Sequence, residues 1–349
     1  MTSIQGFTPL HAAIVKLAHQ QQLTRDDAAE AFGVIMRGEA SALQIAAMLM
    51  GLRVRGENAA IITGVVRALR EVMVRLPAID PDSLVDTCGT GGGVVPTFNI
   101  STAAALLAAG AGVRIAKHGN RSFSSRCGSA DVLEALGVII DAPLASMAAA
   151  LKDAGIVFMY APLMHPAMKH VGAVRRELAI PTVMNIVGPL ANPAGARRQV
   201  VGVADANRVA TMAGALADLD AIHALVVHGE PGLDEVSPLG LTQVVEIRDG
   251  SSSEWTIDPS DFGLAVTDAK ELAGGDPRAN AEIILDVLGG RGTEGARAAT
   301  ILNAAAAVYV SGRVDSYAAG IKVARDALSG GLGLQALEKL RRASSTSES

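Results

Sequence analysis

A glycine-rich segment is the part of the sequence whose residue types point most directly to chemistry. Residues 88–102 read Cys-Gly-Thr-Gly-Gly-Gly-Val-Val-Pro-Thr-Phe-Asn-Ile-Ser-Thr, after the apolar pair Leu84-Val85 and before an Ala/Leu-rich helix expected to begin near Ala103. Glycines let backbone N–H groups approach a ligand closely, and a helix N-terminus favours negative charge. The segment therefore predicts a phosphate-binding loop, although glycines in a strand-to-helix turn can also be purely steric.

The spacing in this segment excludes the two commonest nucleotide-binding loops. A dinucleotide fingerprint needs a third glycine at position 94, after Gly89 and Gly91, and that residue is Val94. A P-loop needs Gly-Lys-Ser/Thr after four intervening residues, and none follows. We therefore expect the anion to be bound in another way.

A second polar cluster follows the next expected strand. It comprises Lys-His-Gly-Asn-Arg-Ser at residues 117–122 and a serine- and glycine-rich stretch at residues 124–131. Lys117, Arg121 and Arg126 supply cationic donors, and the serines and glycines supply small hydrogen-bonding groups that suit phosphate oxygens. A solvated basic loop would have the same composition, so that alternative stays open.

An acidic pair, Asp234 and Glu235, follows the expected strand at residues 225–227. Adjacent carboxylates at the carboxyl end of a strand suit Mg²⁺, which prefers hard oxygen ligands and often bridges substrate phosphates. A solvated acidic turn is the alternative.

The elements before residue 73 are successive short helices. Thr8-Pro9 gives a cap and a first turn, residues 24–27 resemble a capping box, and residues 41–44 and Asn58 begin two further helices. These helices carry more apolar surface than they can bury alone. Either self-association or packing on a second domain would cover that surface.

From about residue 84, short β-branched runs alternate with Ala-rich helices, which predicts a mainly parallel sheet covered by helices. The expected strands cover residues 113–116, 156–159, 199–203 and 224–228. Residues 243–247 and 254–257 flank Arg-Asp-Gly-Ser, which predicts a hairpin at a sheet edge.

We therefore assign the chain to the α/β class, with a small N-terminal all-helical domain and a large α/β domain around a mainly parallel central sheet. The expected boundaries are 1–73 for the helical domain and 74–342 for the α/β domain. Residues 343–349 are serine-rich and are expected to form a disordered tail.

Composition narrows the classes of function. Half of the 349 residues are apolar, three per cent are aromatic, and the formal net charge is −5, which gives no general attraction to nucleic acid. The two cysteines form neither a disulfide framework nor a zinc motif. No signal-peptide pattern and no charge-free apolar run of about 20 residues is present. We expect a cytoplasmic protein that binds neither membrane nor nucleic acid.

Eight ordered segments together closely resemble the anthranilate phosphoribosyltransferase family. They are residues 89–92, 99–102, 117–122, 128–137, 165–168, 174–178, 185–193 and 227–235. The resemblance covers nearly the whole chain. The family usually has aspartate after Gly-Thr-Gly-Gly, whereas this chain has Gly93, which leaves open the contacts made by that aspartate.

The resemblance implies an activity, cofactors and an assembly. The enzyme would transfer the phosphoribosyl group of phosphoribosyl pyrophosphate (PRPP) to the amine of anthranilate, giving N-(5-phosphoribosyl)anthranilate and pyrophosphate, in tryptophan biosynthesis. It would use Mg²⁺, with two ions per active site, and form a homodimer through the N-terminal helical domain. The helical segment near residues 165–181 would pack with that domain, so that the site lies in the cleft between the domains.

The matching positions give the expected site residues. The candidates for binding PRPP are Gly89, Thr90, Gly91, Gly92, Thr97, Asn99, Ile100, Ser101, Thr102, Lys117, His118, Gly119, Asn120, Ser125 and Ser129. The candidates for binding anthranilate are Gly89, Asn120, His165 and Arg175, of which Arg175 can bind the carboxylate in a fork. The expected metal ligands are Ser101, Asp234 and Glu235.

The expected mechanism is displacement of pyrophosphate by the anthranilate amine through a transition state with oxocarbenium character. No nucleophile with an attendant base is evident, so catalysis would rest on positioning and on metal ions. No catalytic residue is therefore assigned, and His118 is only one of three candidate proton acceptors, with pyrophosphate and water.

Two alternatives remain at this stage. A pyrimidine nucleoside phosphorylase would show Lys-His-Ser-Thr-Gly-Gly at residues 117–122. A nucleic-acid-binding relative of the same fold would carry a basic groove, which the acidic balance disfavours.

Overall fold

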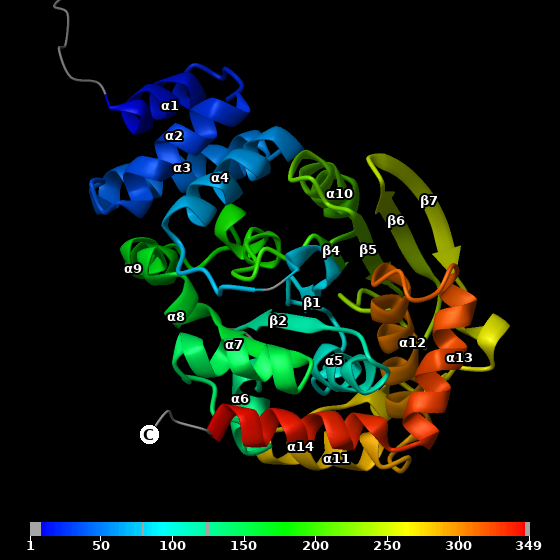
Figure 1. The fold of residues 1–349 in the computed structure, drawn as a ribbon. Coiled ribbons are helices and arrows are strands. Elements are labelled where there is room, and N and C mark those ends of the chain that lie inside the picture. The colour runs from blue at the N-terminus through cyan, green and yellow to red at the C-terminus, as the bar shows by residue number, and fades with distance from the viewer. Residues whose placement is uncertain (1–7, 79, 123–125, 346–349) are drawn as a thin grey trace, which may run out of the picture.

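The computed structural model describes residues 8–78, 80–122 and 126–345. The N-terminal helices lie on one side of a central sheet, and the C-terminal helices cover the other side (Figure 1). The first helices are α1 (Pro9–Ala18), α2 (Arg25–Met36), α3 (Ala42–Arg55) and α4 (Ala59–Val72). Each begins at the cap that the sequence predicts, because side-chain oxygens of Thr8, Thr24, Ser41 and Asn58 accept backbone N–H groups of the first turn.

The central sheet has the strand order β3-β2-β1-β4-β5-β6-β7. Its strands are β1 (Val85–Gly89), β2 (Ile115–Gly119), β3 (Ile156–Tyr160), β4 (Arg198–Gly202), β5 (His223–Gly229), β6 (Thr242–Arg248) and β7 (Ser251–Ile257). Strands β1 to β5 are parallel to one another, whereas β6 pairs antiparallel with β5 and with β7. The mainly parallel sheet and its edge hairpin are confirmed.

The remaining helices follow β1 in the sequence. They are α5 (Ile100–Gly110), α6 (Ser129–Ala135), α7 (Leu144–Asp153), α8 (Ala161–Met164), α9 (Lys169–Leu178), α10 (Val209–Asp218), α11 (Pro277–Leu288), α12 (Glu294–Val310), α13 (Tyr317–Ser329) and α14 (Leu332–Ser345). Short 3-10 turns include η2 (Pro166–Met168) and η4 (Gly188–Leu190). None of the helices in the described ranges combines the length and apolar character needed to cross a membrane.

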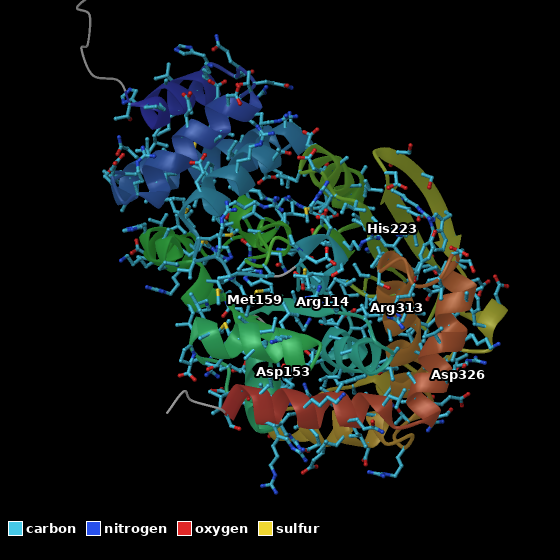
Figure 2. The ribbon with its side chains drawn as sticks, viewed as in Figure 1. Arg114, Asp153, Met159, His223, Arg313 and Asp326 are labelled. Carbon is cyan, nitrogen blue, oxygen red and sulfur yellow. The ribbon has the colours of Figure 1, made fainter. Side chains whose placement is uncertain are left out.

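Alternate residues of the central strands face two different hydrophobic cores. Val200 on β4 packs with α5 and the C-terminal helices, whereas the next residue, Val201, packs with the N-terminal helices and α10. This alternation is the two-residue period of a strand buried on both faces. A third cluster, which includes Met147 and Met159, packs α7 against β3 (Figure 2 labels Met159).

The N-terminal helices join the rest of the molecule through two helices. Helix α10 packs on α4, and α9 packs on α2 and α3. An ion pair between Arg25 and Asp218, with 2.6 Å between Nη2 and Oδ2, strengthens the first contact. The exact boundary at residue 73 stays a prediction.

Several expected boundaries differ from the structure, among them the start of β7, which lies at Ser251 rather than at residue 254. Helix α5 begins at Ile100 rather than near Ala103, because the Asn99 carbonyl already accepts the Ala103 N–H at 3.1 Å. Strand β2 begins at Ile115, two residues after the expected start. The tail expected from Ala343 is wrong for its first residues, because α14 continues to Ser345 and the buried Ser344 accepts the Ile139 N–H at 3.1 Å. Residues 346–349 lie outside the described ranges.

Candidate functional site

The expected site residues gather where parallel strands end. Strands β1, β2, β4 and β5 run in the same direction, so the loops after Gly89, Gly119 and Gly229 leave the sheet at one edge. Ligands of open α/β sheets bind at this carboxyl edge. The fold therefore brings the glycine-rich loop, the basic cluster and the acidic pair to one end of the sheet.

The acidic pair binds directly to the glycine-rich loop and to α5. The Gly91 N–H donates to Asp234 Oδ2 at 2.7 Å, and the Ser101 N–H donates to Glu235 Oε1 at 3.2 Å. These contacts join segments more than 130 residues apart in the sequence. The two amides are groups that a phosphate-binding loop offers to an anion, and here carboxylates accept their hydrogen bonds.

Glycine is required at the positions beside Asp234 because the backbone segments approach each other so closely there. A Cβ at Gly89 would lie 2.3 Å from Asp234 Oδ2, and one at Gly202 would lie 1.7 Å from the Asp234 carbonyl oxygen. Gly91 has a φ of 72°, which also favours glycine. At Gly93, a Cβ would lie 3.3 Å from Asp234 Oδ1, so a side chain there would contact the acidic pair.

The acidic pair has unusual electrostatics. Burial, reinforced by the neighbouring charge of Asp234, raises the pKa of Glu235 to about 8, although Lys117 and the Ser101 N–H act in the opposite direction. Burial likewise raises the pKa of Asp234, and the Gly91 N–H opposes it. Two crowded carboxyl groups of this kind favour a cation between or beside them.

Lys117 reaches the same place from β2. Its Nζ donates to the Thr87 carbonyl on β1 and, at 3.3 Å, to Ser101 Oγ on α5. The amine is buried, so its charge lies close to the acidic pair with little water to screen it. Lys117, Ser101 and Glu235 therefore form one hydrogen-bonded group.

His118 and His165 lie together beside this group, with ring centroids 5.0 Å apart. Burial and then the neighbouring His165 lower the pKa of His118 to about 3, and burial lowers the pKa of His165 to about 4. Their rings hydrogen-bond the backbone of Gly188 and Ala191, respectively, and both Nε2 atoms lack a hydrogen-bond partner within the described residues. Both rings are neutral at pH 7 and present an unsatisfied nitrogen.

The loop after β2 is bound to its own helix and to the glycine-rich loop. The Ser129 Oγ donates to the Asn120 carbonyl at 3.3 Å. Asn99 connects the two loops, because its Nδ2 donates to the Cys127 carbonyl at 3.2 Å and its Oδ1 accepts from Asn280 at 2.9 Å. Hydrogen bonds thus link the predicted residues Asn99, Asn120 and Ser129 to the same loop, the one that follows β2.

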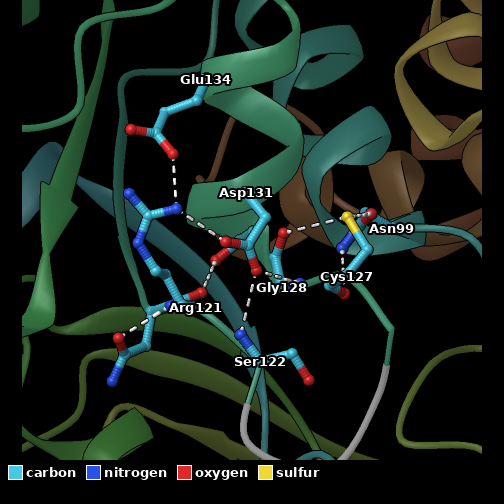
Figure 3. A network of polar contacts seen from close by, with 9 residues as sticks. Asn99, Arg121, Ser122, Cys127, Gly128, Asp131 and Glu134 are labelled. Carbon is cyan, nitrogen blue, oxygen red and sulfur yellow. Dashed lines mark hydrogen bonds and ion pairs between the residues drawn. The ribbon is translucent and has the colours of Figure 1, made fainter. Parts of the chain in front are cut away.

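Arg121 differs from the expectation of a phosphate donor. Its Nη1 lies 2.8 Å from Asp131 Oδ1 and 2.5 Å from Glu134 Oε2, both on α6 (Figure 3). Asp131 also accepts the N–H groups of Gly128 and Ser122, so its carboxylate caps the start of α6. Arg121 therefore stabilises the loop by pairing with carboxylates of α6, the helix that follows the loop.

The other predicted residues have varied places. Thr90 Oγ1 accepts the Ala204 N–H at 3.2 Å, and Thr97 is half-buried beside Gly274. Ile100 and Thr102 are buried in the first turn of α5, so only their backbone faces the loop. Arg175 is half-buried on α9, where burial lowers the pKa of its guanidinium. Ser125 lies outside the described residues, and Gly92 is exposed with a φ of 83°.

Two residues beside the site were not predicted from the sequence. Asp86 is fully buried on β1 and accepts the His118 N–H at 3.1 Å and the Asn192 Nδ2 at 2.7 Å. The available signal was an aspartate in a buried strand, which needs partners. The sequence does not tell which residue supplies them.

The acidic pair and Ser101 suit a magnesium ion by chemistry, because all three offer hard oxygen ligands. Within the described ranges, no group of three or more His, Cys, Asp or Glu side chains is arranged to hold a metal. An enclosed cavity between Ser101, Glu235 and Asn303 has a volume of about 10 Å³. This volume suits one water molecule at most, so a substrate would bind above the strand ends.

Family models match the sequence over most of its length. The helical bundle domain of the glycosyl transferase family matches residues 11–73, and the a/b domain of that family matches residues 81–334. The anthranilate phosphoribosyltransferase of Rubrobacter xylanophilus is 48% identical over 335 residues, 96% of this chain and 97% of that protein. That of an Anaeromyxobacter species is 47% identical over 95% of this chain and 97% of that protein.

Solved structures of the same name superpose on the chain. The anthranilate phosphoribosyltransferase of Thermus thermophilus is 40% identical, with a TM-score of 0.90 over 96% of this chain and 99% of that one. The Saccharomyces cerevisiae protein, in complex with PRPP and Mg, is 28% identical, with a TM-score of 0.87 over 96% of this chain and 98% of that one. The Saccharomyces cerevisiae protein was also solved with 4-fluoroanthranilate.

Proposed function

The chain belongs to the anthranilate phosphoribosyltransferases, and from this premise we propose that PRPP and anthranilate meet above the carboxyl ends of β1, β2 and β5. The reaction transfers the phosphoribosyl group of PRPP to the amine of anthranilate and releases pyrophosphate, as a step of tryptophan biosynthesis. One observation carries the proposed location: the acidic pair is bound to the glycine-rich loop and to the first turn of α5.

We place the pyrophosphate of PRPP over the glycine-rich loop. The exposed backbone at Gly92 and the buried Lys117 offer a donor and positive charge to its oxygens. The N–H groups of Thr90, Gly91 and Ser101 already donate to acceptors within the protein. Asp234, Glu235 and Ser101 would hold Mg²⁺, which neutralises charge on the departing pyrophosphate when it is bound. Two ions is the number that we propose, one near the acidic pair and one near Ser101.

We place anthranilate on the side of the two histidines. Arg175 would bind the carboxylate through its planar guanidinium, while Gly89, Asn120 and His165 would line the ring and the amine. His118 bonds the Gly188 backbone, so its Nε2 is free within the described residues to accept the amine hydrogen. A ring with a pKa of about 3 holds a proton weakly, so we assign it a hydrogen-bond acceptor role rather than that of a strong base.

The described residues offer no nucleophile with an attendant base, so we propose a direct displacement. The chain's residues bind both substrates in one orientation, and the fixed donors near the pyrophosphate stabilise the charge that develops as the C1′–O bond breaks. The amine forms the new C1′–N bond as the C1′–O bond breaks, and its proton passes to pyrophosphate or water.

We also propose a homodimer through the N-terminal helices. Leu43 and Val54 on α3 are 84% and 78% exposed, and a groove of about 430 Å³ lies between α1 and α3. Apolar residues such as Ile14 and Leu17 line this groove. An exposed apolar face of this kind is typical of a subunit interface. A cytoplasmic location remains a prediction from composition.

A fluorescence assay tests the activity. Purified protein with PRPP, Mg²⁺ and anthranilate is expected to consume anthranilate, seen as loss of its emission, and to release an equal amount of pyrophosphate. Phosphorolysis of thymidine and uridine is measured in parallel. Turnover of either nucleoside without consumption of anthranilate would replace this function with that of a pyrimidine nucleoside phosphorylase.

A further inference from the structure

Strands β1 and β2 are neighbours in the sheet, but their backbone ladder is short. Their ladder pairs Val85 with Ile115 and goes no further between these two described strands. In contrast, β1 pairs with β4 at five positions, and β2 pairs with β3 at five positions. The backbone hydrogen bonding therefore has a gap between the strand that carries the glycine-rich loop and the strand that carries Lys117 and His118.

Side chains bridge this gap, where backbone hydrogen bonds between β1 and β2 are missing. Asp86 on β1 accepts the His118 N–H of β2 at its Oδ1, at 3.1 Å. Asn192 lies between the strands, because its Nδ2 donates both to Asp86 Oδ2 at 2.7 Å and to the Ala116 carbonyl of β2 at 2.9 Å. The side-chain amide of Asn192 thus bonds both β1 and β2.

The orientation of Asn192 is fixed by a third contact. Its Oδ1 accepts the Ala194 N–H at 2.9 Å, so a flip of the amide would lose this bond and place an oxygen against the carboxylate. Asn192 is 1% exposed and Asp86 is 0% exposed. A buried carboxylate needs all its donors, since an unpaired one is costly. The pair therefore defines a single separation of β1 from β2.

The segment that ends at Asn192 also supports the two histidines. The Gly188 backbone bonds the ring of His118, and the Ala191 backbone bonds the ring of His165. Asn192 is thus bonded at once to β1, to β2 and, through its own chain, to the supports of both imidazoles.

We infer that Asp86 and Asn192 are positioning residues for the transfer reaction: their hydrogen bond sets the distance between the glycine-rich loop after β1 and the Lys117–His118 pair on β2. This inference rests on the proposed function, because it assumes that the two substrates bind on either side of that gap. Neither side chain touches a substrate. Each acts through the strand that it holds.

Exchanging the two side chains tests the inference. In Asp86→Asn, the new NH₂ group would face another donor, either the His118 N–H or the Asn192 Nδ2. In Asn192→Asp, the two carboxylates of Asp86 and residue 192 would face each other. The double variant restores a donor opposite an acceptor, although the Ala116 carbonyl stays without its donor. We expect each single variant to lower kcat/KM for PRPP by about tenfold or more, and the double variant to lose less than the product of the two single losses.

Glu246 provides a matched control. It is a mostly buried carboxylate that hydrogen-bonds the side chains of His223, Trp255 and Tyr309, away from the site (Figure 2 labels His223). Glu246→Gln should lower the melting temperature and leave kcat and KM within about twofold. Single variants at 86 and 192 that behave like this control, or a double variant whose losses multiply, would overturn the inference.

Binding separates this inference from the proposed function. Calorimetry of PRPP with Mg²⁺ should show weaker binding in both single variants than in the parent chain, and recovery in the double variant. A parent chain that turned over no anthranilate would contradict the proposed function, whereas an active parent whose single variants bind and react normally would contradict only the positioning role.

Discussion

At the scale of single residues, the site combines groups whose ordinary charges are altered by burial. The pKa of Glu235 is raised to about 8, while the pKa of His165 is lowered to about 4. Both shifts come chiefly from desolvation, which disfavours whichever form is charged. A divalent cation favours the ionised carboxylate, so cation binding at the acidic pair should release protons near neutral pH.

Removal of the acidic charges should abolish the dependence on magnesium. The double variant Asp234→Asn with Glu235→Gln keeps the size of both side chains but offers a cation only neutral oxygens. We expect the Mg²⁺-stimulated rate to disappear while the circular dichroism spectrum stays that of the parent. Full activity in this variant would exclude the pair as metal ligands.

Arg175 should affect anthranilate rather than PRPP. Arg175→Ala removes one charged hydrogen-bonding contact, worth about 1.5–3 kcal/mol, and should lower kcat/KM for anthranilate by roughly tenfold to a hundredfold. Arg175→Lys keeps the charge but not the two-pronged guanidinium, so it serves as the control. Its kcat/KM for anthranilate should lie between that of the parent and that of Arg175→Ala. An unchanged KM and kcat/KM for anthranilate would contradict this role.

His165 should make the protein sensitive to acid. The pKa of an imidazole in the unfolded chain is 6.5, and that of His165 in the folded chain is about 4, so the unfolded state binds more protons between these values. Stability therefore rises with pH from about 4 to 6.5 and is lost on acidification through this range. The free energy of unfolding, measured with urea, should therefore fall between pH 7 and pH 5 by about 2 kcal/mol less in His165→Asn than in the parent. Identical pH dependence in both proteins would show that His165 is not buried as a neutral ring.

At the scale of elements, the connection from β2 to α6 is held by charges within the connection itself. Burial alone would raise the pKa of Asp131, but N–H groups from Gly128 and Ser122, with Arg121, hold the pKa below its usual value. The carboxylate therefore stays ionised and caps α6 while Arg121 binds it (Figure 3). The network secures both ends of the loop that carries Asn120 and Ser129.

Loss of Arg121 should loosen this loop and weaken PRPP binding. We expect Arg121→Ala to raise KM for PRPP by about threefold to tenfold, because partly exposed pairs contribute about 1 kcal/mol or less each and this arginine makes two. Arg291→Ala removes a comparable exposed pair, with Asp286 at the end of α11, and should leave KM within about twofold. Equal effects of the two variants in steady-state kinetics would refute the role of the loop.

The sequence predicts these elements better than it predicts their contacts. The caps at Thr24 and Ser41 depend on residues three positions apart, so the local pattern contains them. The bond between Asp86 and Asn192 joins residues 106 positions apart, and no local pattern reports which buried partners will meet. The site residues could be named because the family resemblance, rather than periodicity, identifies them.

At the scale of the whole molecule, two cores on opposite faces of one sheet unite the helical and α/β parts. The core on the N-terminal side includes residues of α2, α4 and α10 together with Val201 and Val226 of the sheet. The helices and the sheet thus share buried surface, and the exposed apolar groove between α1 and α3 faces away from it. We propose that a second copy of the chain binds at this groove.

Charges placed on the exposed apolar residues of α3 should keep the proposed subunits apart. The double variant Leu43→Asp with Val54→Asp is expected to be monomeric in sedimentation or light scattering, because desolvating two carboxylates opposes association. Ile139→Asp alters an exposed apolar residue, 46% accessible, outside the groove and should leave the parent's assembly state unchanged. A parent that is already monomeric, or a double variant that stays dimeric, would rule out this interface.

The end of β4 has a consequence for how this chain can evolve. At Gly202, a methyl group would overlap backbone atoms of Asp234, and no rotamer change can move a backbone carbonyl aside. A saturation library selected for growth without tryptophan should therefore return glycine almost alone at position 202, although that residue offers no side chain to either substrate. Such intolerance would be a purely geometric fingerprint of how tightly the acidic turn is folded over the sheet.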